Sequence, residues 1–409
     1  MPPSHSKERD MPRPSILFAA PHRLAFLTGS LGLLSVAAWW LVSLMGMQSG
    51  LIALGPGSLP AALMHGPAMI FLSYSPFIFG FLLTVFPRWM GLSDLTLRQF
   101  GPIAALLAAG SGVAQVGLWT SAVWAVQAGF ALFSIGWTVG LVVLAMALWS
   151  ARRAGKPPCW HAASAIAALL SGLLALLLVQ QFVYSDDPRL LRAANQLAMN
   201  ACLLPIFLTV AHRMVPFFAA SAVTGYHPWR PNWLLPALWV LLLARLLGGL
   251  VLLDDLIALG SFGLAVLGTL MLWRWWPRAA APGLLKVLIW GFAWAPVGFG
   301  LSGLASIGLP FGLAPTHALM IGFSGSLLVA MVTRVTQGHS GRPLEMFALG
   351  WLAFVAVQVA AVLRVWAALR FEHPALLSVA ALVFLIGLMP WLLRNAAIYV
   401  RPRIDGRNG

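Results

Sequence analysis

Charged side chains are scarce in this chain. Only 9% of its 409 residues are Asp, Glu, Lys or Arg, and 60% are apolar. Soluble domains normally carry about 25% charged residues, so a soluble fold is excluded. Apolar runs long enough to cross a bilayer as helices recur along the whole sequence. The composition therefore predicts an all-α polytopic transmembrane bundle that has the lipid bilayer as its immediate partner.

Acidic residues are the rarest charges, with 10 Asp and Glu against 25 Lys and Arg. None of the ten falls in the core of an apolar run. Proton pumps and proton-coupled carriers usually have carboxylates inside the membrane, so that class is disfavoured. The net charge of +15 does not indicate nucleic-acid binding, because the basic residues are spread over short loops instead of forming one patch.

Cysteine and the common catalytic motifs are also missing. The two cysteines, Cys159 and Cys202, are too far apart in sequence for a cysteine metal cluster, and a disulfide framework is not supported. The sequence contains no H-E-x-x-H, no G-x-S-x-G and no phosphate-binding glycine loop. Hydrolytic and phosphate-transferring enzymes are therefore not supported, and whether the protein is an enzyme stays open.

What is present is a series of twelve apolar segments, the third and fourth joined by a tight connection near Thr120. A single membrane domain, 23–400, lies between short polar tails at 1–22 and 401–409. The N-terminal tail lacks the pattern of a cleavable signal peptide, so the first segment is expected to stay as a signal anchor. The predicted segments are about 24–47, 62–86, 101–119, 122–148, 161–183, 196–220, 233–253, 256–274, 284–308, 315–336, 346–368 and 375–399.

The basic residues predict the orientation of the bundle. If the N-terminus is cytoplasmic, 20 of the 25 Lys and Arg residues fall on the cytoplasmic side. Four fall on the other side, and Arg245 lies within a segment. Such a bias is the positive-inside pattern, so both termini are predicted to be cytoplasmic.

The stretch 315–343 has a histidine at each end of its apolar part. His317 and His339 are 22 residues apart, which as helix is roughly 33 Å, about one bilayer core. They are therefore predicted on opposite faces, where they cannot share a metal. His65 opens the second segment on the same side as His317. The similar surroundings of His65 and His317 indicate either a distant duplication or coincidence, and coincidence is favoured.

His65 and His317 are the best-matched pair of candidate metal ligands. Imidazole is a common ligand of haem iron and of copper. The two rings could bind one haem from both sides, or one could hold iron and the other copper. The alternative is that each is an interfacial histidine in a helix cap.

Further candidates lie at the inner side and in mid-membrane. His212 and Arg213 precede Pro216, which is expected to loosen the backbone beside a cavity, with a simple boundary cluster as the alternative. Arg245 lies midway along the seventh segment, where a charge is costly and a haem propionate or anionic substrate is a candidate partner. Carbonyls and water are the alternative there. Arg342 follows His339 in a turn that could hold an anion, or the turn is a simple loop.

At this point the sequence resembles a known family. The run T-R-V-T-Q-G-H-S-G-R-P-L, preceded by H-A-L-M-I-G, resembles the NnrS family. Members are twelve-helix bacterial inner-membrane proteins that contain haem and copper and belong to the nitric oxide response. Three other runs are similar to family motifs: P-H-R-L-A-F-L near the start, H-G-P-A-M-I-F leading to G-F-L-L-T-V-F-P-R-W-M-G, and H-R-M-V-P-F-F-A.

One motif departs from the family pattern. Relatives typically have H-A-H-E-M in the second helix, whereas this chain has H-G-P-A-M at 65–69, without the second histidine and the glutamate. The resemblance implies that this protein binds haem. It gives weaker support for copper, because possible copper ligands are missing. The cofactor-binding candidates that the resemblance implies are His65, His317, Arg213, Arg334, His339 and Arg342. Arg245 is a seventh candidate because of its position within the membrane.

The resemblance implies a haem-binding protein of the bacterial inner membrane. Its expected role is in the nitric oxide response or in protection from nitrosative stress, with nitric oxide or another small ligand as its partner. The alternative is a cofactor-free membrane transporter or channel for a small solute.

Overall fold

The computed structural model describes residues 16–50, 59–371 and 373–406. The described chain contains no β-strand, and twelve of its helical spans are long and apolar enough to cross a membrane. The predicted all-α bundle of twelve helices is confirmed. After the short 3₁₀ turn η1 (Ile16–Phe18), the helical elements are α1 (Pro21–Ser49), α2 (Ala61–Pro67), η2 (Ala68–Tyr74), α3 (Ser75–Trp89), α4 (Leu97–Thr120), α5 (Val123–Arg153), α6 (Trp160–Ser185), α7 (Pro188–Leu197), η3 (Ala198–Leu203), α8 (Leu204–Ala222), α9 (Leu234–Val251), α10 (Asp254–Trp275), α11 (Gly283–Phe292), α12 (Trp294–Ser306), α13 (Ala314–His317), η4 (Ala318–Gly325), α14 (Ser326–Ser340), α15 (Ala348–Leu369) and α16 (Pro374–Tyr399).

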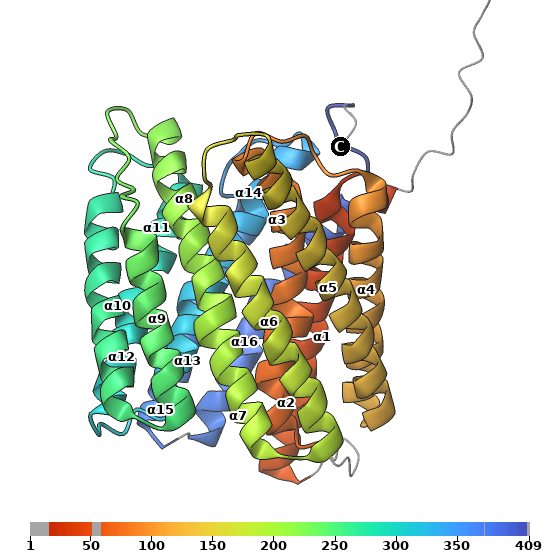
Figure 1. The fold of residues 1–409 in the computed structure, drawn as a ribbon. Coiled ribbons are helices and arrows are strands. Elements are labelled where there is room, and N and C mark those ends of the chain that lie inside the picture. The colour runs from red at the N-terminus through yellow and green to blue at the C-terminus, as the bar shows by residue number, and fades with distance from the viewer. Residues whose placement is uncertain (1–15, 51–58, 372, 407–409) are drawn as a thin grey trace, which may run out of the picture.

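The first and last spans meet at one end of the bundle (Figure 1). Arg23 Nη1 donates to the carbonyl oxygens of Tyr399 and Arg401, at 3.1 and 2.8 Å. We call this the terminal end, and the other the opposite end. That the terminal end faces the cytoplasm remains a prediction from the charge distribution. Most of the predicted N-terminal tail, and the last three residues of the C-terminal one, lie outside the described residues.

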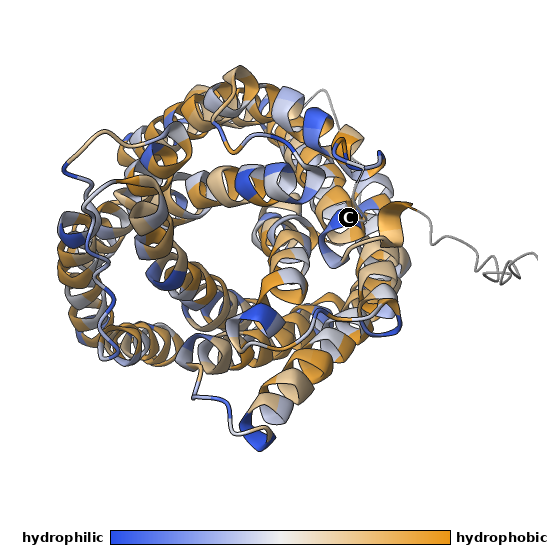
Figure 2. Ribbon diagram, turned by 90° about the horizontal axis from the view of Figure 1, so that it is seen from above, coloured by the Kyte–Doolittle hydropathy of each residue, from blue (hydrophilic) through white to orange (hydrophobic). Residues whose placement is uncertain are grey.

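Three spans form the interior of the bundle. In the second, sixth and tenth spans, 89, 78 and 72% of an 18-residue apolar stretch is buried inside the protein. The corresponding share is 28–56% for the other nine described spans. Viewed from above, some helices lie within a surrounding ring of others (Figure 2). Each interior span also contains a π-helical segment: η2, η3 and η4 respectively. These wider turns are uncommon and are often found at functional sites.

The π-helical segments recur at every fourth span. His65 and His317 open the second and tenth spans in similar sequence surroundings, and each is followed by a π-helical segment. This regularity supports a repeated four-span unit more strongly than the sequence alone does.

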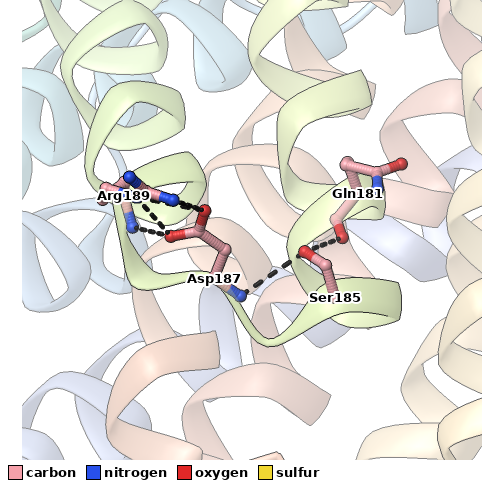
Figure 3. Close-up of polar contacts among 4 residues, drawn as sticks. All are labelled: Gln181, Ser185, Asp187 and Arg189. Carbon is pink, nitrogen blue, oxygen red and sulfur yellow. Dashed lines mark hydrogen bonds and ion pairs between the residues drawn. The ribbon is translucent and has the colours of Figure 1, made fainter.

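The sixth span begins earlier than predicted. The sequence indicated a start at about 196, but α7 begins at Pro188. The Asp187 carboxylate caps the helix by accepting a hydrogen bond from the backbone N–H of Arg189 at 2.9 Å, and it forms an ion pair with the Arg189 guanidinium. The backbone N–H of Asp187 donates to the Ser185 hydroxyl (Figure 3). The hydrogen bond from the Arg189 side chain is the main cause that holds the pKa of Asp187 below its ordinary value. The hydrogen bond from the Arg189 backbone is the second cause. Polar residues in the first turns hid this helix from the hydropathy pattern.

Two other local expectations changed. α8 runs through Pro216 without a break, and the irregular backbone of this span is η3 instead. His339 is helical, because α14 continues to Ser340 and ends at Gly341 in the left-handed conformation (φ 75°). The tight connection near Thr120 is confirmed: only Ser121 and Ala122 separate α4 from α5.

Candidate functional site

His65 and His317 both lie at the opposite end of the bundle. His65 lies in the last turn of α2, and His317 is the last residue of α13. The imidazole of His65 stacks on Trp40, with ring centroids 4.0 Å apart and planes 17° apart. Arg364 of α15 lies close enough to both rings to act on them electrostatically, and His65 lies close enough to act on His317. We call His65, His317 and Arg364, with Trp40, the histidine-pair site.

The hydrogen bonds indicate which ring nitrogens are available. His317 Nδ1 lies 2.9 Å from the carbonyl oxygen of Leu313. A carbonyl only accepts hydrogen bonds, so Nδ1 donates and the Nε2 of a neutral ring carries the lone pair. Metal-binding histidines are commonly oriented in this way by a backbone carbonyl. His65 Nδ1 is buried without a hydrogen-bond partner. Each ring therefore has a nitrogen that the described protein does not use.

A layer of aromatic side chains connects the three interior spans. The Tyr74 hydroxyl, at the end of η2, donates to the Met320 carbonyl in η4 at 2.9 Å. Phe207 of the sixth span makes edge contacts with both Tyr74 and Phe323. A π-helical turn leaves backbone groups poorly paired, and Tyr74 satisfies one of them.

We expect Tyr74→Phe to lower the stability of the protein by about 0.5–1.5 kcal/mol. The change removes a buried hydroxyl and leaves the Met320 carbonyl without this donor. Thermal unfolding of the detergent-purified protein would show the difference. Tyr184→Phe, at a side chain that is 66% exposed, is the control and should leave the midpoint unchanged. Equal midpoints for the two variants would contradict the role given to the hydroxyl.

An apolar cavity of about 50 Å³ lies between α3, α8 and α14. Binding sites for drug-sized ligands and cofactors have about 300–1,000 Å³, so a haem does not fit this space. The walls are entirely apolar: Phe26, Phe77, Ile78, Phe81, Ile206, Phe207, Val210, Ala211, Met214, Val215, Leu288, Leu327, Leu328, Met331 and Val332.

Two of the predicted arginines lie over aromatic rings. Arg213 lies over Trp89, 5.0 Å from the ring centroid, and Arg334 lies over Phe218 at 3.6 Å. Such cation–π contacts stabilise a guanidinium at low polarity. Neither arginine lines the apolar cavity, although Met214 and Met331 from the same two helices do.

The seven predicted cofactor-binding residues lie in three places. His65 and His317 form the pair at the opposite end, whereas Arg213, Arg334, His339 and Arg342 lie toward the terminal end, up to the full length of a span away. Arg245 is separate, buried in α9 against α10 and α12. One haem therefore cannot use all seven, and the histidine-pair site is the part that matches the prediction of paired ligands.

The sequence did not reveal two histidine contacts at the terminal end. His161 Nε2 and His212 Nδ1 are 2.9 Å apart, and the ring centroids of His22 and His339 are 4.7 Å apart. Each histidine lies near the end of a span, but hydropathy does not specify which faces of different spans meet. Within the described ranges, no three His, Cys, Asp or Glu side chains form a group suited to a metal ion.

The fold and this site define the class: a polytopic helical membrane protein with two half-buried candidate histidine ligands at one end. The family described as NnrS protein matches residues 16–403, nearly the whole chain. The chain belongs to the NnrS family, and the resemblance seen in the sequence motifs is confirmed. A search of curated proteins finds no significant match.

Proposed function

We propose that this protein binds haem through His65 and His317 and acts in the nitric oxide response of the bacterial inner membrane. The observation that carries the proposal is that two interior spans each place an imidazole at the same end of the bundle, where Arg364 acts on both rings. Both rings retain a nitrogen that has no partner in the part of the chain that the structure describes. Neutral imidazole from two sides is a common way to hold haem iron.

The surroundings of the pair suit this cofactor. Trp40 offers an aromatic face beside His65, and Arg364 places a positive charge near both rings. A guanidinium is suited to a carboxylate, so Arg364 would bind a haem propionate. When bound, haem supplies an iron that can take a diatomic ligand such as nitric oxide.

Copper is less well supported at this site. Relatives have a histidine and a glutamate where this chain has Pro67 and Ala68, so two candidate ligands are absent. The remaining described ligands, His65 and His317, are too few for a typical closed protein copper site. Haem needs only one or two axial side chains and is the better match.

The function can be tested in cells that lack the gene. Wild-type protein should restore growth under a nitric oxide donor, whereas His65→Ala and His317→Ala should each fail at equal membrane levels. His227→Ala, in the exposed loop between α8 and α9, is the matched control and should restore growth. Full rescue by both site variants would contradict the proposal. A cofactor-free carrier would then be the better account.

A further inference from the structure

Arg245 is a buried cation that has no counter-charge among the described residues. Its side chain is in α9, about two turns from the opposite end, and the residue is only 7% exposed. Nη2 lies 3.2 Å from the Ser302 hydroxyl, while Nε and Nη1 are buried and have no hydrogen-bond partner. The guanidinium also lies over the Phe299 ring, 5.1 Å from its centroid.

No acidic group of the described chain neutralises it. Arg245 takes part in none of the described ion pairs. The nearest acids in sequence, Asp254 and Asp255, are exposed at the start of α10. A guanidinium stays charged in proteins, so proton loss does not relieve the cost of burial. An uncompensated buried charge is strongly destabilising, whereas a bound counter-ion offsets that cost.

The surrounding groups are suited to an anion. Ser261 and Ser302 lie 3.2 Å apart, and Ser302 is also next to Arg245. When the Ser302 oxygen accepts from both neighbours, its own proton remains free to donate. That proton and the unused N–H groups of Arg245 make several donors without a described acceptor.

The depth of the site also permits access. Ser302 is four residues from the end of α12 and Ser261 seven from the start of α10, which as helix is on the order of 6–10 Å. All three side chains are therefore close to the opposite end of the bundle. An ion from that aqueous side needs to cross only a short distance.

From this geometry we propose that Arg245, Ser261 and Ser302 form a binding site for a small monovalent anion such as chloride or nitrite. The site is independent of the histidine pair and of haem. The anion neutralises Arg245 and accepts hydrogen bonds from the guanidinium and a serine hydroxyl. Its occupation stabilises the packing of α9 against α10 and α12.

Thermal unfolding in detergent tests the site, with Trp fluorescence as the signal. The protein is prepared in sodium gluconate and titrated with chloride or nitrite at constant ionic strength. Binding to the native state raises the midpoint saturably, here by about 2–4 °C. Arg245→Met should abolish this response and raise the midpoint in gluconate, because it removes the uncompensated charge. Ser302→Ala and Arg245→Lys should need several-fold more anion.

An exposed arginine supplies the control. Arg274→Met, on the surface of α10, should keep the full response. If Arg245→Met does not fold, the weakened responses of the other two variants still carry the test. Absence of an anion response in wild type, or an unchanged response in all three site variants, would overturn the proposal.

The haem-free double variant His65→Ala/His317→Ala separates a free ion from a haem carboxylate. A response in both wild type and the double variant supports the free anion. A response in the double variant alone would identify the occupant as a haem propionate and overturn the assignment to a free ion.

Discussion

Alanine in place of His65 or His317 is expected to remove haem from the purified protein. Loss of outer-shell partners of metal ligands costs about 10–100-fold in affinity, and loss of an axial ligand should cost at least the upper value. His65 also loses its stack with Trp40, so the packing of the first span beside the cofactor changes. Haem content per protein, measured as the pyridine complex, gives the direct comparison.

The matched control is again His227→Ala, which changes an exposed imidazole far from the pair. It should retain the haem content of wild type. If either site variant keeps full haem occupancy, that histidine is not an axial ligand and the pair is not the site.

Gly129→Leu should strongly destabilise the outer helices. A Cβ at Gly129 would lie 2.2 Å from the backbone nitrogen of Ala114, and one at Gly110 would lie 2.5 Å from the backbone of Phe133. Small residues allow this close approach of α4 and α5, as is common in membranes. Overpacking typically costs about 1–3 kcal/mol, and backbone atoms cannot move aside, so we expect about 3 kcal/mol or more.

The comparison for this variant lies on the same pair of helices. Gly112 of α4 faces open space, with nothing within 4 Å of a built Cβ. Gly112→Leu should unfold at the wild-type temperature or slightly above it, because glycine is the poorer helix former. Similar midpoints for Gly129→Leu and Gly112→Leu would contradict the close packing of α4 and α5.

Much of the fold was predictable because hydropathy and charge act along the chain. Twelve apolar runs specify twelve spans, and Gly341 marks the end of the tenth helix as a C-cap glycine should. His65 and His317 were paired by their equal place in two spans and by resemblance. Their shared neighbour Arg364 belongs to a third span, and only the packing of helices brings it there.

Other features depend on contacts that have no one-dimensional signal. The π-helical segments have no sequence rule comparable to a capping motif, so irregular backbone was expected at Pro216 instead of at η3. The start of α7 was missed because its polar face carries Arg189 and Arg192 in an otherwise apolar span. The contact between His161 and His212 requires the mutual rotation of two helices, which hydropathy does not specify.

The structure separates three kinds of environment within one bundle. The opposite end holds the histidine pair, and the centre holds an apolar cavity that is too small for a haem. Arg245 lies apart from both, among the outer helices α9, α10 and α12. A cofactor reaction and an anion effect can therefore be changed independently by substitutions at the two sites.

The central claim is that this chain holds haem at its histidine pair. The most direct measurement is the absorption spectrum and iron content of the wild-type protein, purified in detergent after expression with ample haem. We predict a Soret band and bound iron in proportion to the protein. A colourless, iron-free preparation would contradict the claim and favour a cofactor-free transporter or channel.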